Sequence, residues 1–434
     1  MKQLFIISIC IFINLSVLAQ DTIPTKKVYN TRRIQNEPPR IDGLIDKDIW
    51  DIVEWSDGFI QRSPNDGQAP SQKTAFKVLY DDDNLYILIR AFDTEPDKIV
   101  QRMSRRDGFD GDWVEVNIDS YDDDRTAFSF TASVSGVKSD EYISNDGDNW
   151  DPTWDPIWYL KTSIDEEGWI AEMKIPYTQL RFSNHKESQV WGFQINRRFF
   201  RNEEKSQWAY FSQDESGWVR HFGELRGIKN IKPKRQLEVS PYVLAKTESY
   251  TKDEDNPYSK GFEPSFGAGL DGKIGITNDF TLNFTINPDF GQVEADPSEV
   301  NLTAFESYFR EKRPFFIESR DITNFQISGG GNSFARDNLF YSRRIGRSPQ
   351  YYPDVDSDND EYTDVPDNTT ILGAMKLTGK TRDGLSIGII ESLAAEEKAD
   401  VSRQGVESTE VVEPMTNYFV ARAQKDLNNN NTII

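Results

Sequence analysis

The chain has 434 residues, of which 72 are acidic and 50 are basic, so its formal net charge is −22. Acidic residues occur along the whole chain, whereas binding a phosphate backbone requires a concentrated basic face. This composition argues against nucleic acid as a partner. The length predicts two to three domains, and aromatic residues make up 12% of the chain, including ten tryptophans.

The N-terminus carries a short positive region followed by an apolar run. Lys2 precedes the run from Leu4 to Leu18, and Ala19 supplies a small residue at its end. This pattern predicts a cleavable signal peptide over residues 1–19. The only cysteine, Cys10, lies inside it, so the mature chain is expected to have no thiol for disulfides, catalysis or soft metals. Later apolar segments are too short to span a bilayer as helices, so any insertion would use β-strands.

Residues from Ile41 to Leu225 form short β-rich runs separated by Asp, Asn, Gly and Pro clusters. This spacing predicts an antiparallel β-sandwich over residues 30–228, with little helix. The run NLYILIRAF (84–92) is apolar on both faces, which predicts a central strand. A linker is expected over residues 229–236, where basic residues surround Pro233. These basic residues also suit contact with anionic head groups.

From Leu237 the predicted strands are longer and alternate more strictly. In FTLNFTIN, Phe280, Leu282, Phe284 and Ile286 share one face, and polar residues occupy the other. Such alternation is typical of strands that face lipid outside and a polar lumen inside. The sequence therefore predicts an all-β chain whose residues 237–434 form a transmembrane antiparallel β-barrel. We expect this barrel to be incomplete, because the strands are fewer than the roughly eight of the smallest barrels. The alternative is a second soluble sandwich.

Four motifs occur in order along the first half: IDGLIDKDIW (41–50), YDDDNLYILIRAFD (80–93), DWVEVNID (112–119) and GWIAEMKIPYTQLRF (168–182). Together they resemble the family 9 carbohydrate-binding module over about residues 30–228. The resemblance implies a jelly-roll-like sandwich that binds glycans without catalysing a reaction. Members of that family hold a terminal sugar between two surface tryptophans, and this pair does not align clearly onto the present sequence.

The second half contains the stretch from DGKIGITNDF to KRPFFIE, followed by FYSRRIGR. It resembles an outer-membrane barrel family of unknown function that is usually fused behind a family 9-like module. The resemblance implies a location in the outer membrane and assigns no activity.

A sugar-binding site is predicted in NDGDNWDPTWDPIW, because aromatic faces stack on pyranose rings and carboxylates bind hydroxyl groups. Pro152 and Pro156 keep this stretch irregular. The predicted carbohydrate-binding residues are Trp150, Trp154 and Asp155, whereas Trp158, Trp50 and Trp169 are expected in the core. The alternative is a packed aromatic corner without a ligand.

Two charged segments suggest further sites. The block from Asn287 to Arg313 is dense in both signs, which predicts ion pairs inside the barrel, with a gate or substrate track as the alternative. Asp354, Asp356, Asp358 and Asp360 alternate like the start of a calcium loop. Asn359 and Val365 depart from that pattern, so a solvated acidic loop is the preferred interpretation and a calcium site is the alternative. The predicted function requires no cofactor.

The predicted function is capture or passage of a saccharide during carbohydrate catabolism at the cell outer membrane. The sandwich is expected in the periplasm, with an oligosaccharide and membrane lipid as partners. One alternative is a transport or assembly barrel whose sandwich binds a protein. Another is a hydrolase of O-glycosyl bonds, although no motif supports a carboxylate pair. A haem site would need His185, His221 or Met173 as ligands.

Overall fold

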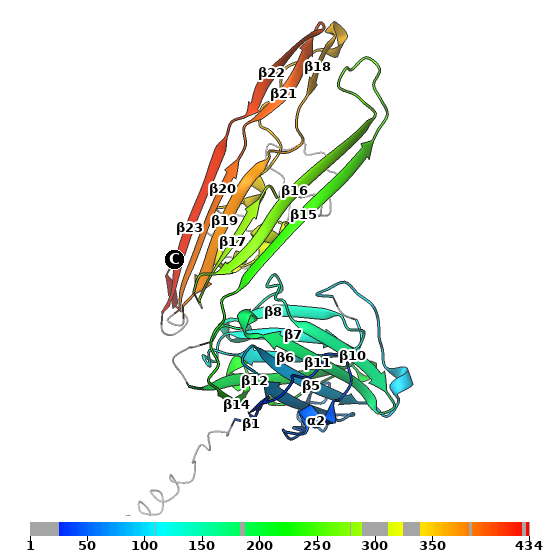
Figure 1. The fold of residues 1–434 in the computed structure, drawn as a ribbon, viewed down its shortest axis with the longest axis vertical. Coiled ribbons are helices and arrows are strands. Elements are labelled where there is room, and N and C mark those ends of the chain that lie inside the picture. The colour runs from blue at the N-terminus through cyan, green and yellow to red at the C-terminus, as the bar shows by residue number, and fades with distance from the viewer. Residues whose placement is uncertain are drawn as a thin grey trace, which may run out of the picture.

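The computed structural model describes residues 26–108, 110–182, 187–277, 279–288, 311–323, 339–381, 384–427 and 431–433. These residues are mostly β, in a sandwich and a tall open sheet above it (Figure 1). The predicted signal peptide lies outside them. As expected, the described helices are short: α2 (Lys47–Trp50), α3 (Pro314–Ile317), α4 (Arg320–Thr323) and 3-10 turns that include η2 (Asn145–Gly147) and η5 (Val219–His221).

The sandwich consists of a nine-stranded and a five-stranded sheet. The larger sheet contains β1 (Val28–Asn30), β3 (Ile60–Ser63), β6 (Trp113–Asp119), β7 (Ala127–Ser133), β8 (Lys138–Ser144), β9 (Asn149–Asp151), β12 (Ser188–Phe199), β13 (Glu204–Gln207) and β14 (Gly223–Lys229). The smaller sheet contains β2 (Arg32–Arg33), β4 (Thr74–Tyr80), β5 (Asn84–Phe92), β10 (Tyr159–Asp165) and β11 (Gly168–Pro176). The predicted sandwich is confirmed, and its strands are antiparallel except for the pairs β1–β14 and β2–β4.

Strand β5 is central, as predicted, because it lies between β11 and β4. Its two faces bury apolar side chains in different cores. Ile87 and Ile89 pack in the main core between the sheets, whereas Leu88 packs with Trp50 of α2 in a smaller core. This arrangement explains why both faces of the strand are apolar.

Arg197 of β12 ties the two sheets of the sandwich together. Its guanidinium donates to the carbonyls of Lys73 and Phe92, both at 2.8 Å, and to the hydroxyl of Thr74 at 3.2 Å. Burial lowers the pKa of Arg197 to about 10, because the charged form loses its hydration. A buried guanidinium that holds two strand-end carbonyls fixes how the sheets stack.

The second half forms a seven-stranded antiparallel sheet of β15 (Leu237–Ser249), β16 (Phe262–Gly275), β17 (Phe280–Ile286), β19 (Ile371–Lys380), β20 (Leu385–Ala394), β23 (Thr416–Leu427) and β24 (Asn431–Ile433). A three-stranded sheet of β18 (Glu361–Asp364), β21 (Glu397–Arg403) and β22 (Val406–Glu413) stands at the end farthest from the sandwich (Figure 1). In the described residues no sheet closes into a barrel, and β15 and β24 are open edges of the seven-stranded sheet.

The seven-stranded sheet exposes its apolar face and covers its polar face. In β17, Thr281, Asn283 and Thr285 are buried, whereas Ile286 on the other face is exposed. Val243 and Phe266 on that apolar face are 85% and 84% exposed. The alternation expected from the sequence is therefore present. In a water-soluble sheet the apolar face is covered and the polar face is exposed, whereas in this sheet the apolar face is exposed and the polar face is covered.

The polar face is covered in part by the segment that carries α3 and α4. The ammonium group of Lys376 is fully buried and donates to the carbonyls of Phe315 and Glu318. Glu318 also accepts from Asn283 at 2.8 Å. Nearby, Glu311 and Arg313 form a buried pair at 2.7 Å. The described end of the predicted charged block thus forms an ion pair; residues 289–310 of that block lie outside the described residues.

The sandwich and the seven-stranded sheet contact each other directly. The hydroxyl of Tyr121 donates to the carboxylate of Asp279 at 2.6 Å, and Arg181 donates to the hydroxyl of Thr281 at 3.2 Å. The predicted linker runs between the end of β14 and the start of β15, and its Ile231 packs in the sandwich core. Among the described residues, no helix is long and apolar enough to cross a membrane.

Candidate functional site

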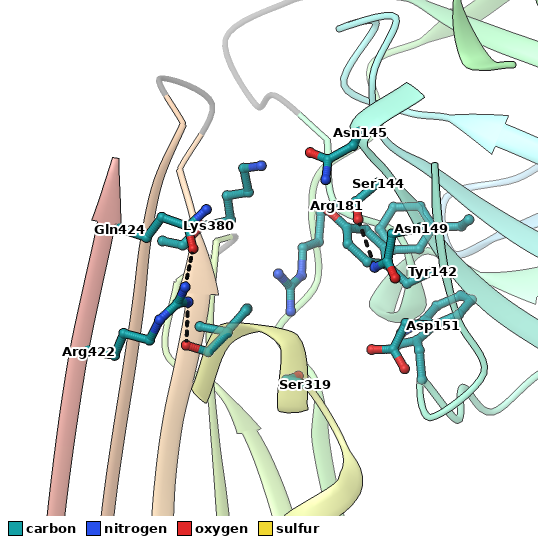
Figure 2. Close-up of a pocket in the computed structure, with 14 residues that line it drawn as sticks. Tyr142, Ser144, Asn145, Asn149, Asp151, Arg181, Ser319, Lys380, Arg422 and Gln424 are labelled. Carbon is teal, nitrogen blue, oxygen red and sulfur yellow. Dashed lines mark hydrogen bonds between the residues drawn. The ribbon is translucent and has the colours of Figure 1, made fainter. Parts of the chain in front are cut away.

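A cavity of about 350 Å³ lies where the sandwich meets the seven-stranded sheet, and we call it the junction cavity (Figure 2). The sandwich contributes aromatic, amide, carboxylate and guanidinium groups: Phe128, Tyr142, Ser144, Asn145, Asn149, Asp151, Trp154 and Arg181. The sheet and the segment on its polar face contribute Ser319, Ile322, Lys380, Ser386, Arg422 and Gln424. The cavity thus combines ring faces with many hydrogen-bonding groups, as small-molecule sites do.

The sandwich wall is built by the chain reversal from β8 through η2 to β9. Asn149 donates from its amide to the hydroxyl of Ser144 at 3.1 Å, which holds the two ends of the reversal together. Asp151 accepts from the backbone N–H of Thr153 at 3.0 Å, forming a side-chain-closed turn. In Figure 2 the side chains of Asn145, Asn149 and Asp151 stand on the wall opposite Gln424 and Lys380.

Trp154 is half-buried on the sandwich wall. Its ring lies 4.9 Å from that of Phe128, tilted by 46°, and 5.5 Å from that of Phe130, nearly edge-on at 72°. Both phenylalanines belong to the main core. The indole is therefore fixed by packing, which lowers the entropy cost of presenting it to a ligand.

The opposite wall is set by strand register. Lys380 of β19 pairs with Ser386 of β20, and Ser386 pairs with Gln424 of β23, so their side chains share the polar face of the sheet. Arg422, two residues before Gln424, is on the same face and donates to the carbonyl of Ile322 at 3.0 Å. Three separate strands thus place polar groups at the end of the sheet nearest the sandwich.

The three residues predicted to bind carbohydrate do not share one cavity. Trp154 lines the junction cavity. Trp150 packs edge-on against Trp218, with ring centres 5.7 Å apart, and donates to the carbonyl of Gly147 at 2.9 Å. Asp155 forms an ion pair with Arg106 at 2.6 Å. Trp50, Trp158 and Trp169 are buried in the core, as predicted.

Asp155 lines a second cavity of about 680 Å³, also between the sandwich and the sheet. Arg106 there bridges Asp155 to Asp140, the second contact being 2.7 Å. On the sheet side, Lys273 pairs with Glu318 at 3.1 Å. Carboxylates outnumber cations in this lining, and the ion pairs tie the charges to one another.

A row of polar side chains on the outer face of the nine-stranded sheet was not predicted from the sequence. We call it the polar row, and it consists of Glu115, Asn117, Asn196 and Gln207. Glu115 accepts from the amides of Asn117 at 2.6 Å and Asn196 at 2.8 Å. Burial raises the pKa of Glu115. The amide oxygens of Asn117 and Gln207 are buried with no hydrogen-bond partner among the described residues. The alternation in DWVEVNID placed Glu115 and Asn117 opposite the core and could have identified them.

Glu141 of β8 lies on the same outer face, paired with Ser129 of β7. Burial, together with the negative charge of Glu115, raises its pKa to about 7. Because Glu141 changes its charge near neutral pH, the charge of this outer face depends on pH in that range.

The other predicted ligands do not converge. Met173 is buried in the main core, His221 stacks on Phe211 with ring centres 4.3 Å apart, and His185 lies outside the described residues. In the acidic loop, Asp356 accepts from the backbone of Asp358 and from the amide of Asn359, which closes a turn. Within the described ranges, no group of three or more His, Cys, Asp or Glu side chains is arranged to hold a metal ion.

Comparison with known families divides the chain in two. Residues 41–217 match the model described as carbohydrate family 9 binding domain-like, and residues 233–434 match a domain of unknown function, DUF5916. The chain therefore contains a family 9-like (CBM9-like) domain followed by a DUF5916 domain. No curated protein matches the chain.

Solved structures with similarity to the chain match it at low identity. A carbohydrate-binding module of family 9 from Caldicellulosiruptor kristjanssonii, in complex with glucose, is 20% identical, with 48% of this chain and 97% of that chain covered and a TM-score of 0.35. The same module in complex with cellotriose is also 20% identical, with 48% and 100% covered and a TM-score of 0.35. A protein from Bacteroides uniformis is 12% identical, with 46% and 99% covered and a TM-score of 0.38.

Proposed function

We propose that the sandwich binds a glycan in the junction cavity and that the seven-stranded sheet holds it at the outer membrane. The observation that carries the proposal is the position of Trp154. Its indole is fixed on the wall of a cavity that also contains Asn149, Asp151 and Arg181. The match of residues 41–217 to a carbohydrate-binding family supports the same ligand class.

The lining suits the chemistry of a sugar. A pyranose ring presents an apolar face of C–H groups, which packs on an aromatic ring such as Trp154 or Tyr142. Its hydroxyl groups both donate and accept, and the cavity offers amides, a carboxylate and a guanidinium for both roles. At about 350 Å³, the cavity falls in the range of roughly 300–1,000 Å³ typical of small-molecule sites. It suits the terminal part of a glycan rather than a long stretch of polymer.

The reversed polarity of the seven-stranded sheet supports a place in the membrane. Its exposed face carries Val243, Phe266 and Phe419, while Lys376 and Thr378 are buried on the other face. Lipid chains would cover the apolar face and leave the polar face toward a lumen. We infer that this sheet belongs to an outer-membrane β-barrel, that the sandwich lies on the periplasmic side, and that the protein captures or passes saccharides during carbohydrate catabolism.

The proposal is tested by screening the full chain, purified in detergent, against an array of oligosaccharides. Trp154→Ala is expected to abolish binding, because the ring face is lost. Trp55→Ala is the matched control, since Trp55 is an exposed tryptophan of the sandwich whose ring contacts Lys77. Absence of binding to every glycan by the unmodified protein would refute the proposal.

The polar row is a second candidate position for the sugar, because buried amide oxygens without partners mark a place for water or ligand. Glu115→Gln distinguishes the two positions. If the glycan binds in the junction cavity, this substitution leaves its affinity unchanged. If Glu115→Gln abolishes binding and Trp154→Ala does not, the sugar lies at the polar row instead.

A further inference from the structure

We propose that the junction cavity selects an acidic glycan, one that carries carboxylate or sulfate groups. This inference rests on the proposed glycan-binding function and specifies its ligand. It follows from the charges that the seven-stranded sheet adds to the sandwich wall.

Cations outnumber carboxylates among the described residues that line the junction cavity. Arg181, Lys380 and Arg422 line it, together with the carboxylate of Asp151. The chain as a whole carries a net charge of −22, so a locally positive cavity runs against its overall composition. In a partly enclosed site, charges act through a lower effective dielectric than in water and are screened less by salt.

The cations converge from distant parts of the sequence. Arg181 follows the sandwich strand β11, Lys380 ends β19, and Arg422 lies in β23. Figure 2 shows Arg181 reaching from the sandwich into the space that Lys380 and Arg422 border from the sheet. Their shared location depends on the contact between the two halves of the protein.

Arg181 is held in place by neutral oxygens. Its guanidinium donates to the carbonyl of Asp279 at 3.4 Å and to the hydroxyl of Thr281 at 3.2 Å. Both contacts are long for such bonds and leave room for a stronger acceptor. A carboxylate or sulfate matches the planar fork of a guanidinium and makes shorter, charge-assisted hydrogen bonds.

The neighbouring second cavity shows that positive charge is not a general property of the junction. Its lining includes Arg106, Lys138 and Lys273, but a larger number of carboxylates, including Asp155 and Glu318. An anion is therefore favoured in the junction cavity and opposed in its neighbour. The ring of such a sugar stacks on Trp154 while its acidic substituent faces the three cations.

The test measures the affinity of the full chain in detergent for three trisaccharides of equal length: a glucose trimer, a galacturonate trimer and a sulfated trimer. We expect tighter binding of an acidic trimer than of the glucose trimer by about tenfold or more, which corresponds to one charge-assisted contact. Raising the salt concentration should weaken binding of the acidic trimer and leave that of the glucose trimer unchanged.

Substitution of the cationic residues tests whether they cause the preference for the acidic trimers. Lys380→Gln and Arg181→Gln should each weaken binding of the acidic trimer about tenfold more than binding of the glucose trimer. Lys398→Gln is the matched control, because Lys398 is exposed in the three-stranded sheet and pairs with Glu396. Trp154→Ala should abolish binding of all three trimers.

The outcomes separate the two proposals. Equal affinity for all trimers, or a preference that Lys380→Gln and Arg181→Gln leave unchanged, would overturn the inference and leave glycan binding intact. Binding of the glucose trimer alone would do the same. If none of the trimers binds, both the acidic preference and its assignment to this cavity are rejected. If an acidic trimer binds more tightly than the glucose trimer, the comparison of the galacturonate trimer with the sulfated trimer identifies which acidic group is recognised.

Discussion

The ring of Trp154 rests on that of Phe128, 4.9 Å away, and both line the junction cavity. Phe128 is buried in the sandwich core, so the position of the cavity wall is set by core packing. Shortening Phe128 should therefore disturb the ligand site chiefly by removing the support of the Trp154 indole.

We expect Phe128→Leu to weaken glycan binding several-fold, because the indole of Trp154 loses its support and samples more orientations. The same substitution should destabilise the sandwich by about 1–3 kcal/mol through the volume lost from the core. Titration of the variant with a glycan that the unmodified protein binds, at a temperature where the variant is folded, measures the loss of affinity. Unchanged affinity would show that Phe130 alone positions the indole.

Substitution of Arg197 should destabilise the sandwich strongly. Arg197→Ala removes the buried guanidinium that donates to the carbonyls of Lys73 and Phe92, and each hydrogen bond lost from this charged group costs about 1–3 kcal/mol. Urea denaturation followed by tryptophan fluorescence measures the change. Arg198→Ala is the control on the same strand, because Arg198 pairs with exposed Glu203 at the surface and should cost less than about 1 kcal/mol. Equal costs would contradict the bridging role of Arg197.

Stability should depend on pH through Glu141. Its pKa in the folded protein is raised to about 7, chiefly by burial, above the ordinary value of 4.5. The folded state therefore holds the proton more tightly than the unfolded state. The contribution of Glu141 to stability falls as the pH rises from about 4.5 to 7 and is constant above that range.

Glu141→Gln removes this dependence, because glutamine does not ionise. The melting temperature of the variant should match that of the unmodified protein near pH 4.5 and exceed it above pH 7. Differential scanning calorimetry across this range measures the difference. A difference that stays constant with pH would show that Glu141 does not titrate there.

Membrane insertion should be sensitive to charge on one face of β15 alone. Val243→Arg places a cation on the exposed apolar face, at a cost of about 2–4 kcal/mol if that face meets the middle of a bilayer. Refolding into lipid vesicles, followed by gel mobility without heating, measures the folded fraction. Ser240→Arg is the control, because Ser240 occupies the opposite face of the same strand and lines the second cavity. Equal folding of both variants would argue against a lipid-facing sheet.

The local features of the fold were predictable because strand alternation and burial leave a direct pattern in the sequence. The central position of β5 and the burial of Trp50, Trp158 and Trp169 follow from such patterns. The outward apolar face of β17 was predicted in the same way. The parallel pairing of β1 with β14 was not, because it joins segments almost 200 residues apart.

The candidate site was only partly predictable. Trp154 was identified from its aromatic and acidic surroundings, but Trp150, four residues earlier, packs on Trp218 instead. Strand β9 ends at Asp151, and the turn that follows sends the two tryptophans into different clusters. Lys380 and Arg422 reach the cavity through strand register and through the docking of the sandwich on the sheet. Local periodicity contains no information on either.

The pairing of β1 with β14 also bears on how the chain assembles. The first and last strands of the sandwich are neighbours, with Val28 opposite Glu224, so all its strands are available once residue 229 has been synthesised. Among the described residues, the apolar cluster at the seven-stranded sheet is small, and the apolar face of the sheet is exposed. We therefore expect the sandwich to fold first and independently. The seven-stranded sheet should then fold against the already folded sandwich at one end, with its apolar face against a non-aqueous surface.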